Sequence, residues 1–258
     1  MGQGSLTSSF WNPAMNRRTQ SLVTSHTLDA ALRYRAVFAL LGDRWRTGIR
    51  VLEVGSGSGG AAEWTDAEII GVDNAFGRTA ERKRPNLIEH PGSVTAIPMP
   101  DASFDVVLCV DMLEHVSGAD RPRAIAELTR VLAPGGRLIL TFPSGRAAEK
   151  LDRWLAETYA ARHGKPHPWA SEHLELGLPD ANEIAALARA TGATVAVRPN
   201  VWAPAWRFLH GTYTVGRGLP FTWPLFHDPL VTLVYQVLAR LNRAPAYRAI
   251  VIVDRPWA

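Results

Sequence analysis

Two short segments of the sequence are suited to binding a nucleoside. VLEVGSGSGG at 51–60 places Gly55 and Gly57 directly after an apolar run. The missing Cβ atoms there allow a sharp turn and a close approach of ligand to backbone. Asp73 ends a second apolar run, IIGVD at 69–73, and a carboxylate at such a strand end can accept hydrogen bonds from both hydroxyls of a ribose. A helix expected after the loop would direct its free N–H groups at the same ligand.

The glycine spacing alone leaves the ligand open. G-S-G-S-G-G at 55–60 fits the G-x-G-x-x-G pattern of dinucleotide-binding folds only if Gly60 serves as the third glycine. A tight turn between a strand and a helix uses glycines of the same kind without any ligand.

Strands and helices alternate along the chain and must position these residues. The sequence predicts strands at 50–54, 68–73, 86–90, 104–110, 136–142, 193–199 and 247–255, and helices at 27–42, 121–132, 146–161 and 180–191. The polar stretch HGKPHPWASEHLELG at 163–177 is expected to connect two helices. Such alternation indicates an α/β fold, in which helices cover both faces of a mostly parallel sheet.

Further landmarks carry a resemblance to a known family. They are the E-V-G-x-G-x-G loop, the acidic strand end at Asp73, the I-P-M-P-D-x-S-F-D run at 97–105, L-E-H at 113–115 and the L-x-P-G-G turn at 132–136. In order and spacing the chain resembles the class I S-adenosylmethionine-dependent methyltransferases, in particular the small-molecule branch. The resemblance covers roughly residues 48–145 well, 170–200 loosely and the two ends hardly at all.

The resemblance implies a fold and a cofactor. The fold is a Rossmann-like, doubly wound sheet of seven strands in the order 3-2-1-4-5-7-6, with the last strand antiparallel. S-adenosyl-L-methionine is the implied cofactor, and S-adenosyl-L-homocysteine the product derived from it. We expect a single domain with four parts, namely an N-terminal helical cap at 1–47, a cofactor-binding core at 48–201, an aromatic and basic insertion at 202–245 and the final strand at 246–258.

The resemblance also assigns roles to single residues. Glu53 steadies the glycine loop, the backbone at Gly55 and Val110 receives the amino group of the cofactor, and Asp73 holds the ribose. Ser93 and Val94 stand where the family usually has Asp-Ala against the adenine, so the serine puts that contact in doubt. The full set expected to bind the cofactor is Glu53, Gly55, Ser56, Gly57, Asp73, Asn74, Ser93, Val94, Val110 and Asp111.

Two histidines are candidates for proton transfer. A hydroxyl or ammonium acceptor must lose a proton to be methylated, and His115 after the fourth strand and His173 beside Glu172 are placed to receive it. Each could instead be structural.

A metal site is a further possibility for these residues. The segment DMLEH at 111–115 is similar to the acid-x-x-Glu-His metal motif of ubiquinone-biosynthesis and small-RNA O-methyltransferases, with His173 in the place of a later histidine. Because Asp111 replaces the usual first glutamate and no RNA-binding face is evident, we expect no metal.

Charge and aromatic residues suggest the acceptor. Residues 1–50 carry seven Arg and two acidic residues, and 189–258 carry eight Arg and two acidic residues, whereas 51–188 carry thirteen basic and twenty acidic residues. The basic residues are dispersed singly, which argues against nucleic acid. Segment 202–245 combines arginines with aromatic residues and a helix expected from Pro229 to Leu241. It could be a lid, a peripheral membrane contact or an interface with a second copy, so the chain is expected to be a monomer or homodimer.

The sequence therefore predicts methyl transfer from S-adenosylmethionine to a small-molecule or lipid-linked acceptor. The favoured acceptor group is a hydroxyl, and a carbon or nitrogen atom comes second. The alternatives are a cofactor-binding or degenerate partner protein and a nicotinamide-dependent oxidoreductase.

The single Cys109 excludes an internal disulfide. With no apolar N-terminal stretch and no apolar run of about 18 residues, the expected location is cytoplasmic, with peripheral contact at the inner membrane face through 202–245.

Overall fold

The computed structural model describes residues 28–57, 59–76, 84–207 and 242–257. Seven strands form one sheet in the order β3-β2-β1-β4-β5-β7-β6. Their bounds are β1 Val51–Val54, β2 Ile69–Asp73, β3 Leu87–Pro91, β4 Phe104–Val110, β5 Leu132–Pro143, β6 Thr194–Trp202 and β7 Ala246–Asp254. The predicted α/β class and strand order are confirmed.

The register of the strands defines the two ends of the sheet. β1 pairs in parallel with β2 and with β4, so that Leu52 lies opposite Ile70 on one side and Val107 on the other. β7 runs antiparallel between β5 and β6, with Ile250 opposite Thr141. Strands β1 to β6 therefore run in one direction with their carboxyl ends at one edge of the sheet, and only β7, the last of the described strands, is antiparallel, as predicted.

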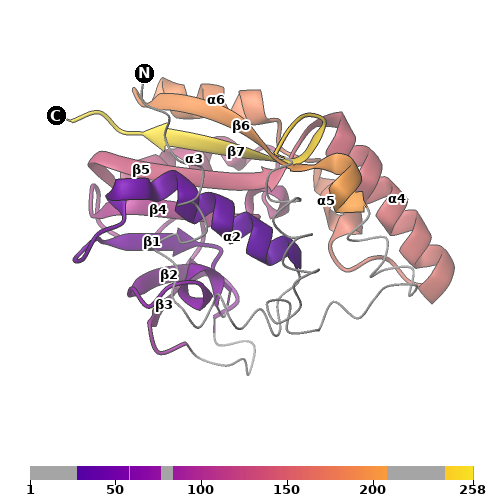
Figure 1. Ribbon diagram of the computed structural model, residues 1–258, viewed down its shortest axis with the longest axis horizontal. Helices are drawn as coiled ribbons and strands as arrows, with labels where there is room; N and C mark the ends of the chain where they lie inside the picture. The colour runs from indigo at the N-terminus through magenta and orange to yellow at the C-terminus, as the bar shows by residue number, and fades with distance from the viewer. Residues whose placement is uncertain (1–27, 58, 77–83, 208–241, 258) are drawn as a thin grey trace, which may run out of the picture.

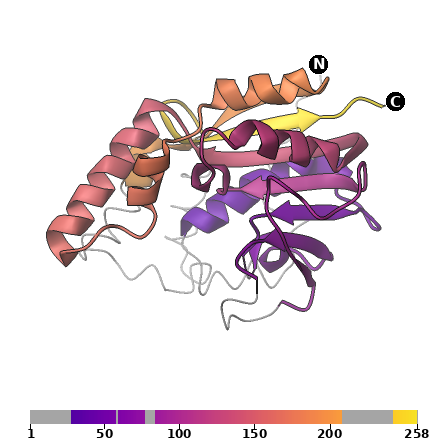
Figure 2. The same ribbon diagram turned by 180° about the vertical axis from the view of Figure 1, so that it is seen from behind.

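Helices cover both faces of the sheet (Figures 1 and 2). They are α2 Leu28–Leu41, α3 Arg121–Arg130, α4 Gly145–His163, α5 Ala170–Leu176 and α6 Ala181–Ala190. Side chains of β4 alternate between two buried clusters. Val106 and Leu108 share one cluster with residues of α2, α4 and α5, whereas Val107 and Cys109 share the other with α3 and α6. This alternation is what a parallel strand buried on both faces requires.

Three local predictions were wrong. The helix expected after the glycine loop is a short 3₁₀ helix, η2 Gly60–Glu63, which begins at a glycine with a φ of +49°. The polar stretch expected as a connection contains α5, because Ala170 and His173 are buried where α5 packs against α4. β5 begins at Leu132 rather than 136, since the L-A-P-G-G turn already pairs with Phe104 of β4.

Part of the chain carries predictions that the structure does not describe. The helix expected from Pro229 to Leu241 lies outside the described residues, as does the start of the N-terminal cap. None of the helices that are described is both long and apolar enough to cross a bilayer.

Candidate active site

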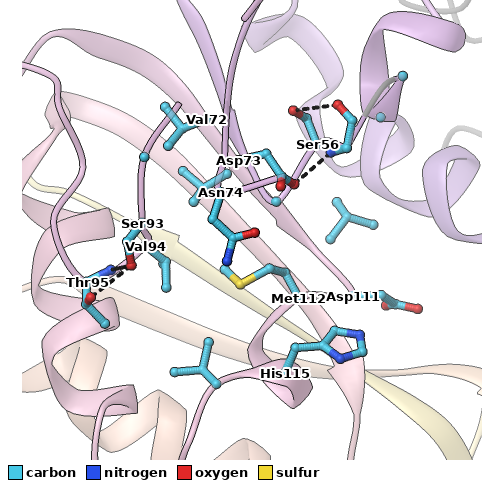
Figure 3. A pocket seen from close by; sticks show the side chains of 18 of the residues that line it. Ser56, Val72, Asp73, Asn74, Ser93, Val94, Thr95, Asp111, Met112 and His115 are labelled. Atoms are coloured by element: carbon cyan, nitrogen blue, oxygen red, sulfur yellow. Dashed lines mark hydrogen bonds between the residues drawn. The ribbon is translucent and has the colours of Figure 1, made fainter. Parts of the chain in front are cut away.

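A cavity of about 740 Å³ opens at the carboxyl ends of β1, β2 and β4 (Figure 3). Val54, Asp73 and Val110, the last residues of these three strands, all line it. Ligands of open α/β sheets bind at this edge, where helices and loops diverge from the strand ends. The cavity is therefore placed where the sequence predicted a nucleoside site.

Two glycines shape the wall of the cavity next to β1. Gly55 and Gly57 both have a positive φ, +79° and +52°, and both line the cavity. A Cβ at Gly57 would meet no protein atom within 4 Å, so it would occupy cavity space. A Cβ at Gly55 would lie 2.3 Å from Cγ of Met112. The loop thus forms a cradle that larger residues would fill.

Asp73 faces this loop from the end of β2. Its Oδ2 accepts the backbone amide of Gly57 at 2.9 Å, and its Oδ1 accepts that of Ala75 at 2.7 Å. A carboxylate offers about four acceptor positions, so each oxygen keeps capacity for a further donor such as a ribose hydroxyl. Asn74 lines the cavity beside it.

Glu53 lies beneath the loop and does not line the cavity. Its side chain is fully buried and accepts the backbone amide of Ala61 at 2.6 Å and the hydroxyl of Tyr34 at 2.9 Å. Burial raises the pKa of Glu53 to about 7, although both hydrogen bonds act in the opposite direction. Glu53 therefore holds the glycine loop from behind, which favours the steadying role that the resemblance assigned to it.

Ser93 and Val94 line the side of the cavity that follows β3. The Ser93 hydroxyl lies 2.9 Å from the Thr95 hydroxyl and accepts the Thr95 amide at 3.2 Å. Serine here turns toward its own loop, while Val94 is buried with an apolar side chain. Together the two residues form a small wall that is apolar at Val94, which suits the flat face of an adenine ring.

Asp111 follows β4 with a φ of +48°. It belongs to a network of ion pairs and hydrogen bonds that has no signal in the sequence. Its Oδ2 lies 2.9 Å from Arg33 Nη1 on α2 and 2.5 Å from Arg248 Nε on β7. Its Oδ1 accepts the hydroxyl of Thr141 at 2.7 Å. Asp111 does line the cavity, but its carboxylate is engaged by two guanidinium groups.

The two predicted histidines lie next to each other, with ring centroids 5.0 Å apart. His115 lines the cavity, and its Nδ1 lies 3.0 Å from Glu172 Oε2 on α5. His173 does not line the cavity and is only 3% exposed. The two candidates therefore differ in their access to the cavity. His115 faces the cavity, and His173 lies behind it.

A chain of hydrogen bonds fixes the ring of His173. Its Nδ1 lies 2.9 Å from Asp152 Oδ2, and Asp152 Oδ1 accepts the hydroxyl of Tyr247 at 2.7 Å. A carboxylate only accepts, so the proton of the ring sits on Nδ1 and the lone pair on Nε2. Burial raises the pKa of Tyr247, which keeps its phenol a donor. Asp152 and Tyr247 carried no signal in the sequence.

Glu114 completes this end of the site. It is 2% exposed, and burial together with the charge of Asp111 raises its pKa well above the usual range. Within the described part of the chain, neither Glu114 Oε2 nor His173 Nε2 has a hydrogen-bond partner. One ligand atom from each of Glu114, His115 and His173 lies within 4.8 Å of the others. The structure thus brings together three of the four residues considered as metal ligands and directs Asp111 elsewhere.

The residues at the glycine end fit S-adenosylmethionine. The cradle at Gly57, the acceptor capacity of Asp73 and the wall at Val94 lie around one cavity. Arg33 and Tyr34 of α2 also line it, and their positions near a loop more than twenty residues away could not be anticipated from the sequence.

Comparisons with known proteins identify methyltransferases as relatives of this chain. A family model described as a methyltransferase domain matches residues 52–140. The demethylmenaquinone methyltransferase of Beutenbergia cavernae is 33% identical over 172 residues, which are 61% of this chain and 70% of the relative. The dimethylglycine N-methyltransferase of Parasynechococcus marenigrum is 32% identical over 42% of this chain and 43% of its own length.

A solved structure gives the same fold. The phosphoethanolamine N-methyltransferase 2 of Haemonchus contortus, in complex with S-adenosyl-L-methionine, superposes with a TM-score of 0.54 at 17% identity. The superposition covers 86% of this chain and 52% of that one. At this identity the likeness concerns the fold alone.

Proposed function

Because the chain belongs to the class I S-adenosylmethionine-dependent methyltransferases, we propose that it transfers the methyl group of this cofactor to a hydroxyl of its small-molecule acceptor. The cofactor supplies a methyl group on a sulfonium, so that the acceptor oxygen forms the new O–C bond while the electrons of the S–C bond return to sulfur. Family membership decides against the nicotinamide-dependent alternative.

We assign the cofactor to the half of the cavity between the glycine loop and Val94. Asp73 accepts the ribose hydroxyls with the capacity that its two backbone contacts leave free. Gly55, Ser56 and Gly57 lie under the methionine part, and the backbone at Val110 and Asp111 receives its amino group. The Asp111 carboxylate is not required for this contact, because it is held by Arg33 and Arg248.

The observation that carries the hydroxyl assignment is the position of His115. Methyl transfer from a sulfonium needs little from the protein except alignment, and a proton acceptor matters only when the nucleophile carries a proton. His115 lines the cavity, and its Nδ1 contact with Glu172 leaves the other ring nitrogen for the acceptor end. The acceptor hydroxyl therefore loses its proton at the His115 end, with His173 behind it as a positioning residue.

Replacing His115 tests this assignment. We expect His115→Ala to lower kcat by about 100-fold with a hydroxyl acceptor and to leave the dissociation constant for S-adenosylhomocysteine within about twofold, because His115 is 37% exposed and its loss opens no core. His163→Ala, which removes an exposed imidazole at the end of α4, is the matched control. A His115→Ala enzyme that keeps its kcat would refute the assignment.

Carbon methylation is the second candidate, and the relative from Beutenbergia cavernae favours it, since its name states demethylmenaquinone as the methyl acceptor. A quinol carries an ionisable hydroxyl beside the carbon to be methylated. Proton removal at His115 would therefore assist methylation of the oxygen and methylation of the carbon alike. Transfer of a ¹³C-labelled methyl group, read by NMR of the product, separates an O-methyl from a C-methyl group.

A lipid-linked acceptor would bring the enzyme to a membrane surface. Support for this comes from the arginines and aromatic residues of 202–245, most of which lie outside the described residues. We expect co-sedimentation with anionic vesicles to exceed that with neutral vesicles and to weaken with salt. Equal, negligible binding to both kinds of vesicle would instead favour a soluble acceptor, methylated by a monomeric or homodimeric enzyme.

A further inference from the structure

Glu114, His115 and His173 place three ligand atoms around one point at the wall of the cavity. The atoms lie within 4.8 Å of one another. Three ligands of one transition-metal ion lie roughly 3.0–3.5 Å apart when each bond is about 2.1 Å. Side-chain rotations that bring the atoms closer by up to about 1.3–1.8 Å would thus complete such a site.

Two of these three residues have a buried polar atom that is left over. Glu114 Oε2 and His173 Nε2 have no hydrogen-bond partner among the described residues, although their residues are 2% and 3% exposed. A buried polar atom without a partner destabilises the fold, and one bound ion would satisfy both atoms. Arg33 and Arg248 act on Glu114 through their charge, but both form ion pairs with Asp111.

The outer contacts of both imidazoles have the arrangement found around metal-binding histidines. His173 Nδ1 contacts Asp152 and His115 Nδ1 contacts Glu172, at 2.9 and 3.0 Å. A histidine that binds a metal through one ring nitrogen usually donates the other N–H to a carboxylate, which fixes the tautomer and the orientation of the ring. The hydroxyl of Tyr247 then holds Asp152 in turn.

We propose that Glu114, His115 and His173 bind one divalent transition-metal ion, such as Zn²⁺, Co²⁺ or Fe²⁺, at the acceptor end of the cavity. Two imidazoles with one carboxylate select this class over Mg²⁺ and Ca²⁺, which prefer oxygen ligands. Because His115 lines the cavity, the open coordination positions face the acceptor. The proposal differs from the expectation of no metal.

The inference rests on the proposed function in one respect, namely that the acceptor enters at the His115 end. It changes how that end activates the acceptor, because with an ion bound the remaining ring nitrogen of His115 is a ligand, and the hydroxyl releases its proton to solvent instead of to His115. A hydroxyl bound to a dication loses its proton more readily than a free one. The preferred substrates are then molecules whose hydroxyl, or pair of adjacent oxygens, can coordinate the ion.

Cobalt binding to the metal-depleted protein tests the site without any acceptor. After dialysis against EDTA and removal of the chelator, we expect one equivalent of Co²⁺ to produce visible d–d absorption bands. His115→Ala should weaken Co²⁺ binding by about 100-fold or more, and the isosteric Glu114→Gln by at least about 10-fold. His163→Ala should bind as the wild type does, and S-adenosylhomocysteine affinity reports that each variant is folded.

The outcomes separate the two proposals. No saturable Co²⁺ binding, or equal binding by wild type, His115→Ala and Glu114→Gln, would overturn the metal site. Methyl transfer to a hydroxyl at full rate in the presence of EDTA would also overturn it, while leaving the proposed function intact. One-to-one Co²⁺ binding that is lost in both variants supports the site even if no hydroxyl acceptor is methylated, a result that would count against the proposed acceptor alone.

Discussion

Asp73 Oδ2 accepts the backbone amide of Gly57 at 2.9 Å, which ties the end of β2 to the loop that follows β1. The carboxylate that is proposed to hold the ribose therefore also sets the shape of the cradle for the methionine part. Removing this carboxylate should therefore weaken cofactor binding in two ways, because the ribose contacts are lost and the glycine loop is held less firmly.

We expect Asp73→Ala to weaken S-adenosylhomocysteine binding by at least about 1.5–3 kcal/mol, or roughly 10- to 150-fold. Asp73→Asn should weaken it less, because one oxygen remains as an acceptor. Isothermal titration calorimetry gives both values. Asp101→Ala, which removes an exposed carboxylate paired with Arg130, should leave the affinity unchanged. An unaltered dissociation constant in Asp73→Ala would mean that the ribose lies elsewhere.

Gly57→Val should block the cofactor while the fold survives. The new side chain would project into the cavity, because a Cβ at Gly57 meets no protein atom within 4 Å. Gly48 offers a matched control, since it also has a positive φ with open space around it but lies in an exposed turn away from the cavity. Both variants should lose about 1–2 kcal/mol of stability from backbone strain, measured by urea unfolding.

Only Gly57→Val should lose measurable binding of S-adenosylhomocysteine. If Gly48→Val lost it as well, the effect would come from backbone strain rather than from occupation of the cavity. If neither lost it, the methionine part would not pass under Gly57.

The cofactor half of the site could be predicted because its signals are local. Gly57 and Asp73 belong to a strand-loop-strand unit in which an apolar run, glycines and a carboxylate follow one another within 23 residues of sequence at 51–73. Strand order came from the family resemblance, which covers these same segments. The loop after β1 was nevertheless expected to start a helix, and the glycines that serve the cavity also limit that helix to one 3₁₀ turn.

The acceptor half could not be predicted because its contacts join distant segments. Asp111 meets Arg248, which lies 137 positions away, and Tyr247 meets Asp152, which lies 95 positions away. Neither pair has a periodic or spacing signal. His173 was identified as a residue type, but its burial behind His115 depends on the packing of α5 against α4, an element that the polar sequence at 163–177 concealed.

Stability should fall with rising pH through Glu53. The pKa of this side chain is raised from 4.5 to about 7 in the folded protein, so between these values the folded state holds a proton that the unfolded chain has released. The free energy of unfolding contributed by Glu53 therefore decreases with pH by up to about 1.4 kcal/mol per unit, roughly 3 kcal/mol in all, and levels off above pH 7.

Comparison with Glu53→Gln isolates this contribution, because glutamine does not titrate. Urea unfolding of both proteins between pH 4.5 and 8 should show the wild type losing stability relative to the variant up to pH 7. A difference that stays constant, or that grows in favour of the wild type, would contradict the raised pKa.

The ion pairs of Asp111 and Asp105 should differ sharply in their effect on stability. Asp111→Asn removes the carboxylate that pairs with Arg248 and Arg33, whose side chains are 5% and 23% exposed. Removing one partner of a buried pair typically costs about 3–5 kcal/mol. Asp105 pairs with Arg50 through both of its carboxylate oxygens, but Arg50 is 54% exposed. Asp105→Asn should therefore cost about 1 kcal/mol or less. Urea unfolding of the two variants in parallel measures both costs, and equal losses would show that the network around Asp111 is solvated rather than buried.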